Sequence, residues 1–255
     1  MRLTVLGGCG AWPTAEQACS GYLVEYEGFR LLVDPGYGSL PRLLEYGASG
    51  GVDAEKVVDS VDAVLVSHGH PDHCADLNPL LRARALSDDP PPALPVHAPH
   101  GAVDAVLALD RPGMYAGAYR LVEFRPGDRF GIGPFTVDTW LLPHFVPNAG
   151  LRIGTPGGVL AYTGDTGASE DIVRVAEGAD LFLSEATYVH RVPEADAPYL
   201  LTARLAGQYA HEAGVGRLLL THLWPGTDPG AAQEAAIESF DGPLGVAAPG
   251  LVVSM

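Results

Sequence analysis

The sequence predicts an α/β fold in which two mixed β-sheets pack face to face and helices cover the outside. The 255 residues are enough to bury a sizeable core, and no segment has the composition of a linker between domains. In each half of the chain, antiparallel strands come first and strand–helix units follow. Several of the apolar strands end directly in histidine or aspartate. We therefore expect a single domain over residues 1–255.

The first half begins with strands and continues with a strand and a helix. The expected strands are Leu3–Leu6, Tyr22–Glu25, Arg30–Val33 and Ala63–Val66. Asp34 begins a turn with Pro35 and Gly36, which ends the third of these strands. The leucine spacing over residues 73–86 predicts a helix.

The second half repeats this plan. The expected strands are Tyr119–Phe124, Phe135–Leu142, Leu151–Ile153, Val159–Tyr162, Leu181–Leu183 and Arg217–Thr221. The expected helices are Ser169–Glu177, Thr202–Ala213 and Pro229–Ser239. Ser169 is suited to cap the first helix, and Gly214 is suited to end the second.

The composition limits the partners of this chain. It carries 31 acidic and 15 basic residues, for a net charge of −16. Affinity for nucleic acid comes largely from lysine and arginine that displace counterions, so large structured RNA is a poor candidate. No apolar run approaches the roughly 20 residues of a membrane span. Three cysteines without metal-type spacing favour reduced thiols and a cytoplasmic location.

The run from His68 to His73 is the strongest functional motif. It follows a predicted strand and contains three imidazoles and a carboxylate. Side chains alternate along extended backbone, so His68 and His70 point the same way and can share one metal ion. After the next turn, Asp72 and His73 can reach a second ion. Neutral imidazole and carboxylate are ligands that suit zinc and similar metals.

Three more residues of the same chemistry follow predicted strands. They are His144, Asp165 and His222. Taken singly, each fits a structural role, because a polar residue at a strand end needs a partner or an exposed position. Together with the His68–His73 run, they predict one metal site at a common edge of the sheets.

These motifs resemble those of the metallo-β-lactamase superfamily, and within it the ribonuclease Z-like branch. The segments that carry the resemblance are Ser67–His73, His144, Tyr162–Thr166, Ser184–Thr187 and Leu219–His222, together with Leu6–Gly10 and Ser20–Val24. The resemblance runs nearly end to end. It implies a four-layer αββα sandwich with a dinuclear metal site on one edge.

The resemblance also implies roles for individual residues. By the pattern of the family, one metal ion is held by His68, His70 and His144, the other is held by Asp72, His73 and His222, and Asp165 bridges the two ions. The implied enzyme is a hydrolase in which a metal-bridging hydroxide attacks the substrate. Asp72 would orient that hydroxide or accept its proton. The expected ions are two divalent cations, zinc with manganese as the alternative.

Two features separate the chain from ribonuclease Z. Those enzymes have a histidine that pairs with the glutamate of a Glu-Ala-Thr motif and helps to protonate the leaving group, but here its position falls near Leu200. Glu185 is retained, and His190 is the candidate that replaces the lost proton donor. Only residues 145–164 separate His144 from Asp165, which leaves no room for the tRNA-gripping arm.

The arm-less bacterial members of this branch, which include cyclic-nucleotide phosphodiesterases, are the most similar group. Segments 185–190 and 213–225 carry that likeness. The sequence therefore favours a phosphodiesterase that acts on a small anionic substrate such as a cyclic nucleotide. The alternatives are a lactone or acyl hydrolase of the same fold, a ribonuclease Z-like endonuclease, which the charge disfavours, and a catalytically weak metal- or ligand-binding protein. A homodimer is left open.

Some further residues are assigned supporting roles. The candidates for an aromatic wall of the cleft are Trp12, Trp140 and Trp224, of which Trp224 is best suited to stack on a base. Asp34 is expected to form a turn or to support a metal ligand. The loop Gly7–Gly10 is expected to pass close to the metals. His97 and His100 are placed in a loop with structural or surface roles.

Overall fold

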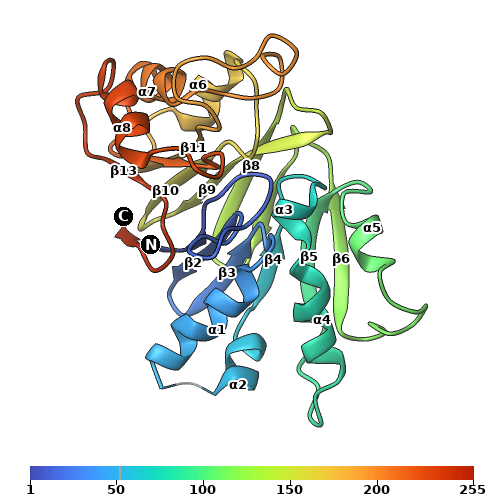
Figure 1. The fold of residues 1–255 in the computed structure, drawn as a ribbon. Coiled ribbons are helices and arrows are strands. Elements are labelled where there is room, and N and C mark those ends of the chain that lie inside the picture. The colour runs from blue at the N-terminus through green and yellow to red at the C-terminus, as the bar shows by residue number, and fades with distance from the viewer. Residues whose placement is uncertain (52) are drawn as a thin grey trace.

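Two seven-stranded sheets lie face to face in the computed structural model, which describes residues 1–51 and 53–255. Helices cover both outer faces, so the layers run helix, sheet, sheet, helix (Figure 1). This confirms the predicted αββα sandwich. The two sheets have the same plan, an antiparallel part followed by a parallel part.

The first sheet has the order β14-β1-β2-β3-β4-β5-β6. Its strands are β1 (Arg2–Gly7), β2 (Gly21–Tyr26), β3 (Phe29–Val33), β4 (Ala63–Leu65), β5 (Leu94–Pro99), β6 (Tyr119–Phe124) and β14 (Val252–Ser254). Neighbours from β14 to β3 are antiparallel, and neighbours from β3 to β6 are parallel. The parallel connections carry α1 (Ser39–Ser49), α2 (Ala54–Asp59), α3 (Pro71–Cys74), α4 (Leu77–Ala85) and α5 (Asp104–Leu107).

The second sheet has the order β13-β12-β11-β10-β9-β8-β7. Its strands are β7 (Arg129–Ile132), β8 (Phe135–Leu142), β9 (Asn148–Thr155), β10 (Gly158–Tyr162), β11 (Leu181–Glu185), β12 (Leu218–Thr221) and β13 (Leu244–Val246). Neighbours from β7 to β10 are antiparallel, and those from β10 to β13 are parallel. The parallel connections carry α6 (Asp171–Ala176), α7 (Ala203–Glu212) and α8 (Pro229–Ile237).

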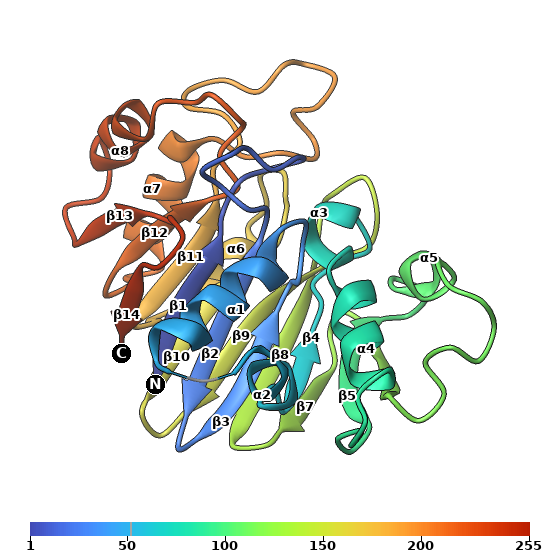
Figure 2. The same cartoon turned by 60° about the horizontal axis from the view of Figure 1, so that its bottom comes forward.

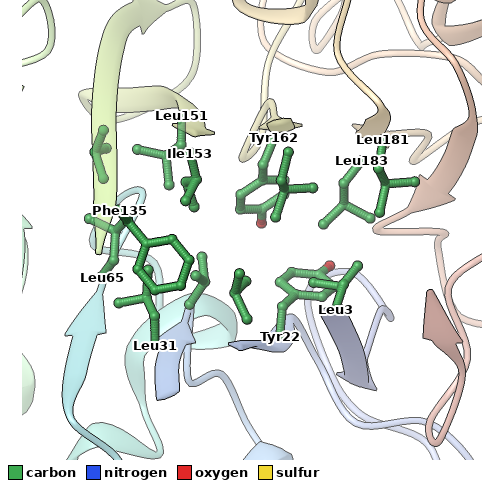
Figure 3. Packing of buried hydrophobic residues seen from close by; sticks show 14 of the residues in the cluster. Leu3, Tyr22, Leu31, Leu65, Phe135, Leu151, Ile153, Tyr162, Leu181 and Leu183 are labelled. Atoms are coloured by element: carbon green, nitrogen blue, oxygen red, sulfur yellow. The ribbon is translucent and has the colours of Figure 1, made fainter. Parts of the chain in front are cut away.

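Three apolar clusters hold the four layers together. One fills the space between the sheets, where Leu31 and Tyr22 face Ile153 and Tyr162 (Figure 3). The other two lie between each sheet and its own helices, with α1, α2 and α4 on the first sheet and α6, α7 and α8 on the second (Figure 2). Burial of each such leucine or isoleucine contributes about 1.5–3 kcal/mol, so the layers stabilise one another.

The central cluster extends toward one end of the strands through two tyrosines. The rings of Tyr22 and Tyr162 pack edge to face with centroids 5.3 Å apart. Their hydroxyls are hydrogen-bonded to Thr221 and Asp34, respectively. The core therefore ends in hydroxyl groups at the edge where the predicted metal ligands lie.

The structure corrects several sequence-based predictions. The expected helix over residues 73–86 is two helices, α3 and α4. The helix expected over Ser169–Glu177 begins later, at Asp171, although the Ser169 hydroxyl still accepts a hydrogen bond from the Asp171 amide. His97 lies in strand β5, not in a loop. The elements α1, α2, α5, β5, β7, β13 and β14 were not predicted.

Other predictions agree with the structure. Thr202 caps α7 by accepting from the Leu205 amide, and Gly214 follows that helix with a φ of 64°. A hairpin of β9 and β10 occupies the segment between His144 and Asp165. No helix in residues 1–51 or 53–255 is both long and apolar enough to cross a membrane. The three cysteines are buried free thiols.

The buried His97 makes stability depend on pH. Its ring stacks on Phe130 with centroids 5.6 Å apart, and its Nδ1 atom has no hydrogen-bond partner among the described residues. Burial and the nearby Arg120 lower the pKa of His97 to about 4. The unfolded chain protonates this residue near pH 6.5, so the folded state loses stability as pH falls from about 6.5 to 4.

We expect His97→Phe, which keeps the stacked ring, to remove this part of the pH dependence. Urea unfolding at pH 7 and pH 4.5 should show that the wild type loses about 2 kcal/mol more than the variant over this range. An equal loss in the two proteins would contradict the assignment.

Candidate metal centre

The seven predicted metal ligands lie together at one end of both sheets. His68, His70, Asp72 and His73 follow β4 in the first sheet, whereas His144, Asp165 and His222 follow β8, β10 and β12 in the second. In α/β sheets, the carboxyl ends of parallel strands gather loops of this kind. His222 has a φ of 57°, and this left-handed backbone turns the chain sharply after β12. Left-handed backbone at residues other than glycine tends to cluster at active sites.

One group of ligand atoms comes from His68, His70, His144 and Asp165. The Nδ1 atom of His70 lies 3.2 Å from His68 Nε2 and 3.0 Å from His144 Nε2. Asp165 Oδ2 lies 3.7 Å from His68 Nε2 and 3.6 Å from His144 Nε2. His70 thus presents Nδ1 to the group, whereas the other two histidines present Nε2.

A second group comes from Asp72, His73, Asp165 and His222. The Nε2 atom of His222 lies 3.2 Å from Asp72 Oδ2 and 3.1 Å from Asp165 Oδ2. His73 Nε2 lies 3.2 Å from Asp165 Oδ1. Asp165 therefore belongs to both groups, which is the arrangement of a carboxylate that bridges two ions.

These spacings fit a metal centre. A tetrahedral zinc ion with bonds of about 2.0–2.1 Å holds its ligand atoms about 3.4 Å apart, and the measured separations are close to that value. His73 Nε2 and Asp165 Oδ1 are buried and have no hydrogen-bond partner in the described part of the chain. Buried polar atoms without partners are costly, and a cation would satisfy both. The role of the seven residues as ligands stays a prediction.

Asp34 orients two of the histidines. It is fully buried, and it accepts hydrogen bonds from His73 Nδ1 at 2.8 Å and from the Ser67 hydroxyl at 2.6 Å. Because the Ser67 hydroxyl donates to Asp34, it is left to accept from His68 Nδ1 at 3.0 Å. Both imidazoles then turn Nε2 toward the centre. Asp34 thus has the supporting role expected from the sequence.

The second sheet orients the other two histidines that use Nε2. His144 Nδ1 donates to the Tyr199 carbonyl at 2.9 Å, and His222 Nδ1 lies 2.9 Å from the Thr187 hydroxyl. Each contact fixes the nitrogen that faces away from the centre. The Ala11 amide donates to Asp72 Oδ2 at 2.8 Å, so the loop after Gly7–Gly10 reaches the site as predicted.

The charges of the cluster balance one another. Burial opposes charge on Asp165, but His222 and His73 outweigh it and hold the pKa of this carboxyl well below its usual range. Burial likewise opposes charge on His73, but Asp165 and Asp72 raise the pKa of that imidazole. At His68, burial outweighs the attraction of the Asp165 carboxylate and lowers the pKa of the imidazole. Metal ions would replace protons on such ligands.

Aromatic side chains lie on the segments next to the ligands. Trp12 and Trp224 contact edge to face at 5.0 Å, and Tyr188 stacks on Trp224 at 6.1 Å. On the other side, the exposed Phe145 packs on Tyr199 at 4.5 Å. The third predicted wall residue, Trp140, instead packs in the cluster between the second sheet and its helices.

Glu185 and His190, the other two predicted catalytic residues, lie in different environments. Glu185 is fully buried at the end of β11 and accepts hydrogen bonds from the Thr166 and Leu201 amides and the Thr187 hydroxyl. His190 is exposed, and no hydrogen bond joins it to Glu185 within the described residues. A role for either residue in proton transfer stays a prediction.

Sequence reasoning assigned no role to Ser67, Thr187 or Tyr199, although each holds a histidine. Ser67 and Thr187 are small polar residues at strand ends beside motifs of the predicted site, and this position could have indicated that they support the predicted ligands. Tyr199 acts through its backbone carbonyl, for which the sequence contains no signal.

Residues 29–223 match the family model described as a β-lactamase superfamily domain. The chain is 31% identical over 255 residues to the probable metallo-hydrolase YhfI of Bacillus subtilis, and the match covers 99% of each chain. It superposes on the crystal structure of YhfI with a TM-score of 0.86 at 29% identity, again over 99% of each chain.

Ribonuclease Z of Methanopyrus kandleri is 31% identical to the chain over 271 residues, and the match covers 92% of this chain and 91% of that protein. The crystal structure of human tRNase Z, short form, superposes with a TM-score of 0.75 at 21% identity, over 100% of this chain and 99% of that one. The latter likeness concerns the fold alone.

Asp34→Asn should weaken metal binding, because its amide N–H would face one of the hydrogen-bond donors that now point at the carboxylate. We expect metal affinity to fall by about 10–100-fold and stability by about 1–3 kcal/mol. Competition with a chromophoric chelator and urea unfolding measure the two effects. Tyr162→Phe is the control, since it removes a single donor to Asp34; an effect as large as that of Asp34→Asn would contradict the assignment.

Proposed function

The chain belongs to the metallo-β-lactamase superfamily, with ribonuclease Z among its relatives, and from this premise we propose that it is a metal-dependent phosphodiesterase for small substrates. The observation that carries the proposal is Asp165, which is shared by the two groups of ligand atoms. Two cations at a few ångströms' separation are typical of enzymes that hydrolyse phosphodiesters. We propose zinc, with manganese as the alternative.

The two ligand groups would hold one divalent cation each. When bound, the cations would lower the pKa of water to near neutrality and stabilise the negative charge that develops on the substrate. Asp72 would orient the attacking water or accept its proton. Burial opposes charge on this carboxyl, but His73 and His222 outweigh it and lower its pKa, so Asp72 is ionised at neutral pH. The Ala11 amide holds its Oδ2 atom in place.

The distribution of charge supports a small substrate with few negative charges. The loops that carry the predicted ligands and their hydrogen-bond partners are 8–20, 34–38, 67–76, 143–147, 163–170, 186–202 and 222–228, and the only lysine or arginine in these segments is Arg191. Beyond the metal ions, little else would neutralise additional phosphates. A phosphodiester with one negative charge suits such a site better than a nucleoside polyphosphate or an RNA backbone does.

The aromatic residues beside the ligands support a planar group on the substrate. Trp12 follows Ala11, whose amide binds Asp72, and Tyr188 follows Thr187, whose hydroxyl contacts His222. Both rings contact Trp224, and stacking of a base on such a ring contributes about 1–3 kcal/mol. A cyclic nucleotide combines one negative charge with a planar base. We therefore propose a cyclic nucleotide as the leading substrate.

The chemistry is tested by assaying bis(p-nitrophenyl) phosphate, 3′,5′-cyclic AMP and a panel of lactones, with zinc and manganese supplied separately. We expect hydrolysis of the phosphodiesters and loss of activity after chelation, restored by added metal. Activity confined to lactones would favour the acyl-hydrolase alternative and overturn the proposal.

Asp165→Ala should lower kcat by at least about 10²–10³-fold, because it removes the ligand shared by both metal groups. The matched control is Asp171→Asn, since Asp171 pairs with Arg174 on the surface and lies outside the ligand groups. Unchanged turnover by Asp165→Ala would remove its bridging role.

The charge argument predicts discrimination against RNA. At equal metal and salt concentrations, kcat/KM for cyclic AMP should exceed that for cleavage of a precursor tRNA by about 10²-fold or more. Gel analysis of the RNA and chromatography of the nucleotide provide the two rates. Comparable values would point to a ribonuclease.

A further inference from the structure

Glu185 lies behind the metal centre, where an isolated charge would be costly. Its side chain is fully buried at the end of β11. Burial and the nearby Asp165 carboxylate raise the pKa of Glu185 to about 8, whereas His222 and the hydrogen bonds from Thr187 and Thr166 act in the opposite direction. A carboxyl in such a place needs partners that satisfy both oxygens.

Three donors meet this need. The Leu201 amide donates to Oε1 at 3.2 Å, the Thr187 hydroxyl donates to the same oxygen at 2.6 Å, and the Thr166 amide donates to Oε2. Three donors already point at the two oxygens of Glu185, and a cation bound beside Asp165 would further favour the charged form, so the contacts match a carboxylate that only accepts. A glutamine would turn an N–H group toward one of these donors. The pattern of contacts is specific to a carboxylate.

One of these contacts leads to His222. The Thr187 hydroxyl has a single hydrogen, which it donates to Glu185, so its oxygen accepts from His222 Nδ1 at 2.9 Å. With its proton on Nδ1, this imidazole offers the Nε2 lone pair to the second ligand group. Glu185 thus selects the tautomer of His222 through one intervening hydroxyl.

The other contacts lead to His144 and Asp165. The bond to Leu201 fixes the segment in which the Tyr199 carbonyl accepts from His144 Nδ1 at 2.9 Å. Thr166, the third donor, is the residue next to Asp165. Glu185 is therefore linked to a histidine of each group and to the backbone beside the carboxylate that both groups share.

We propose that Glu185 is a positioning residue of the metal centre, which sets His222 through Thr187 and holds His144 through the Tyr199–Leu201 segment. All three hydrogen-bond partners donate to Glu185. A positioning role explains all three contacts, and it does not require Glu185 to transfer a proton to the leaving group. The inference rests on the metal centre of the proposed function but not on its substrate.

The test compares Thr187→Val with Thr187→Ser. The valine variant keeps the shape and removes the hydroxyl, so it should weaken binding of one of the two ions by about 10–100-fold and leave the other unchanged. The serine variant restores the hydroxyl and should bind both ions within about threefold of the wild type. Zinc competition with a chromophoric chelator gives the affinities, and titration with cobalt gives the visible absorption of each bound ion.

Glu185→Gln tests the second link of the proposal, the one to His144, together with the link to His222. Because Glu185 is linked to His222 and to His144, this variant should weaken the binding of both ions. The control is Thr4→Val: Thr4 is buried in β1, and its hydroxyl has no hydrogen-bond partner among the described residues, so both affinities should match the wild type. Far-UV circular dichroism checks the fold of each variant, and Glu185→Gln serves as the test if Thr187→Val does not fold.

Two results would overturn the proposal. The first is that Thr187→Val or Glu185→Gln binds both ions with wild-type affinity. The second is that Thr187→Val lowers the affinity for both ions equally. These measurements need no substrate, so they stand even if no phosphodiester is hydrolysed. Failure of the wild type to bind two ions would instead refute the dinuclear centre of the proposed function.

Discussion

Five imidazoles converge on one end of the two sheets, and each can offer a nitrogen to a cation only if the rest of the ring is held. In four of them an oxygen accepts from Nδ1: Ser67 for His68, Asp34 for His73, Tyr199 for His144 and Thr187 for His222. Two buried carboxylates complete this arrangement: Asp34 accepts from His73 directly and from the Ser67 hydroxyl, and Glu185 accepts from the Thr187 hydroxyl. The αββα architecture contributes one of these carboxylates from each sheet, since Asp34 follows β3 and Glu185 ends β11.

Much of the fold and of the candidate site could be predicted, because the signals are local. The His68–His73 run, and single ligands after apolar strands, are visible within a few residues. The supporting contacts are not, since Thr187 and His222 lie 35 residues apart and Asp34 and Tyr162 lie 128 apart. Strand β5 was mistaken for a loop because Pro95 and Pro99 lie within it, and proline is rare inside sheets.

The segment around Leu200 shows how the chain departs from ribonuclease Z. The resemblance places an acid–base histidine at this position, but Leu200 is an almost fully buried apolar residue. Its neighbour Leu201 donates to Glu185, and the Tyr199 carbonyl holds His144. The segment therefore packs against the core and supports the ligands. If the proposed function holds, the net charge of −16 and the presence of only one arginine, Arg191, in the ligand-bearing loops would leave recognition of an anion largely to the metal ions.

The ligands are distributed across both halves of the chain, and this has a consequence for biosynthesis. Asp72 and His222 contact one another across 150 residues of sequence. At about 5–20 residues per second, the ribosome needs about 8–30 s to make that stretch. During this interval the nascent chain carries His68–His73 without Asp165 or His222, so a metal ion captured early would have an incomplete set of the predicted ligands. A dinuclear centre of the proposed kind would reach its full affinity only after the second sheet has folded onto the first.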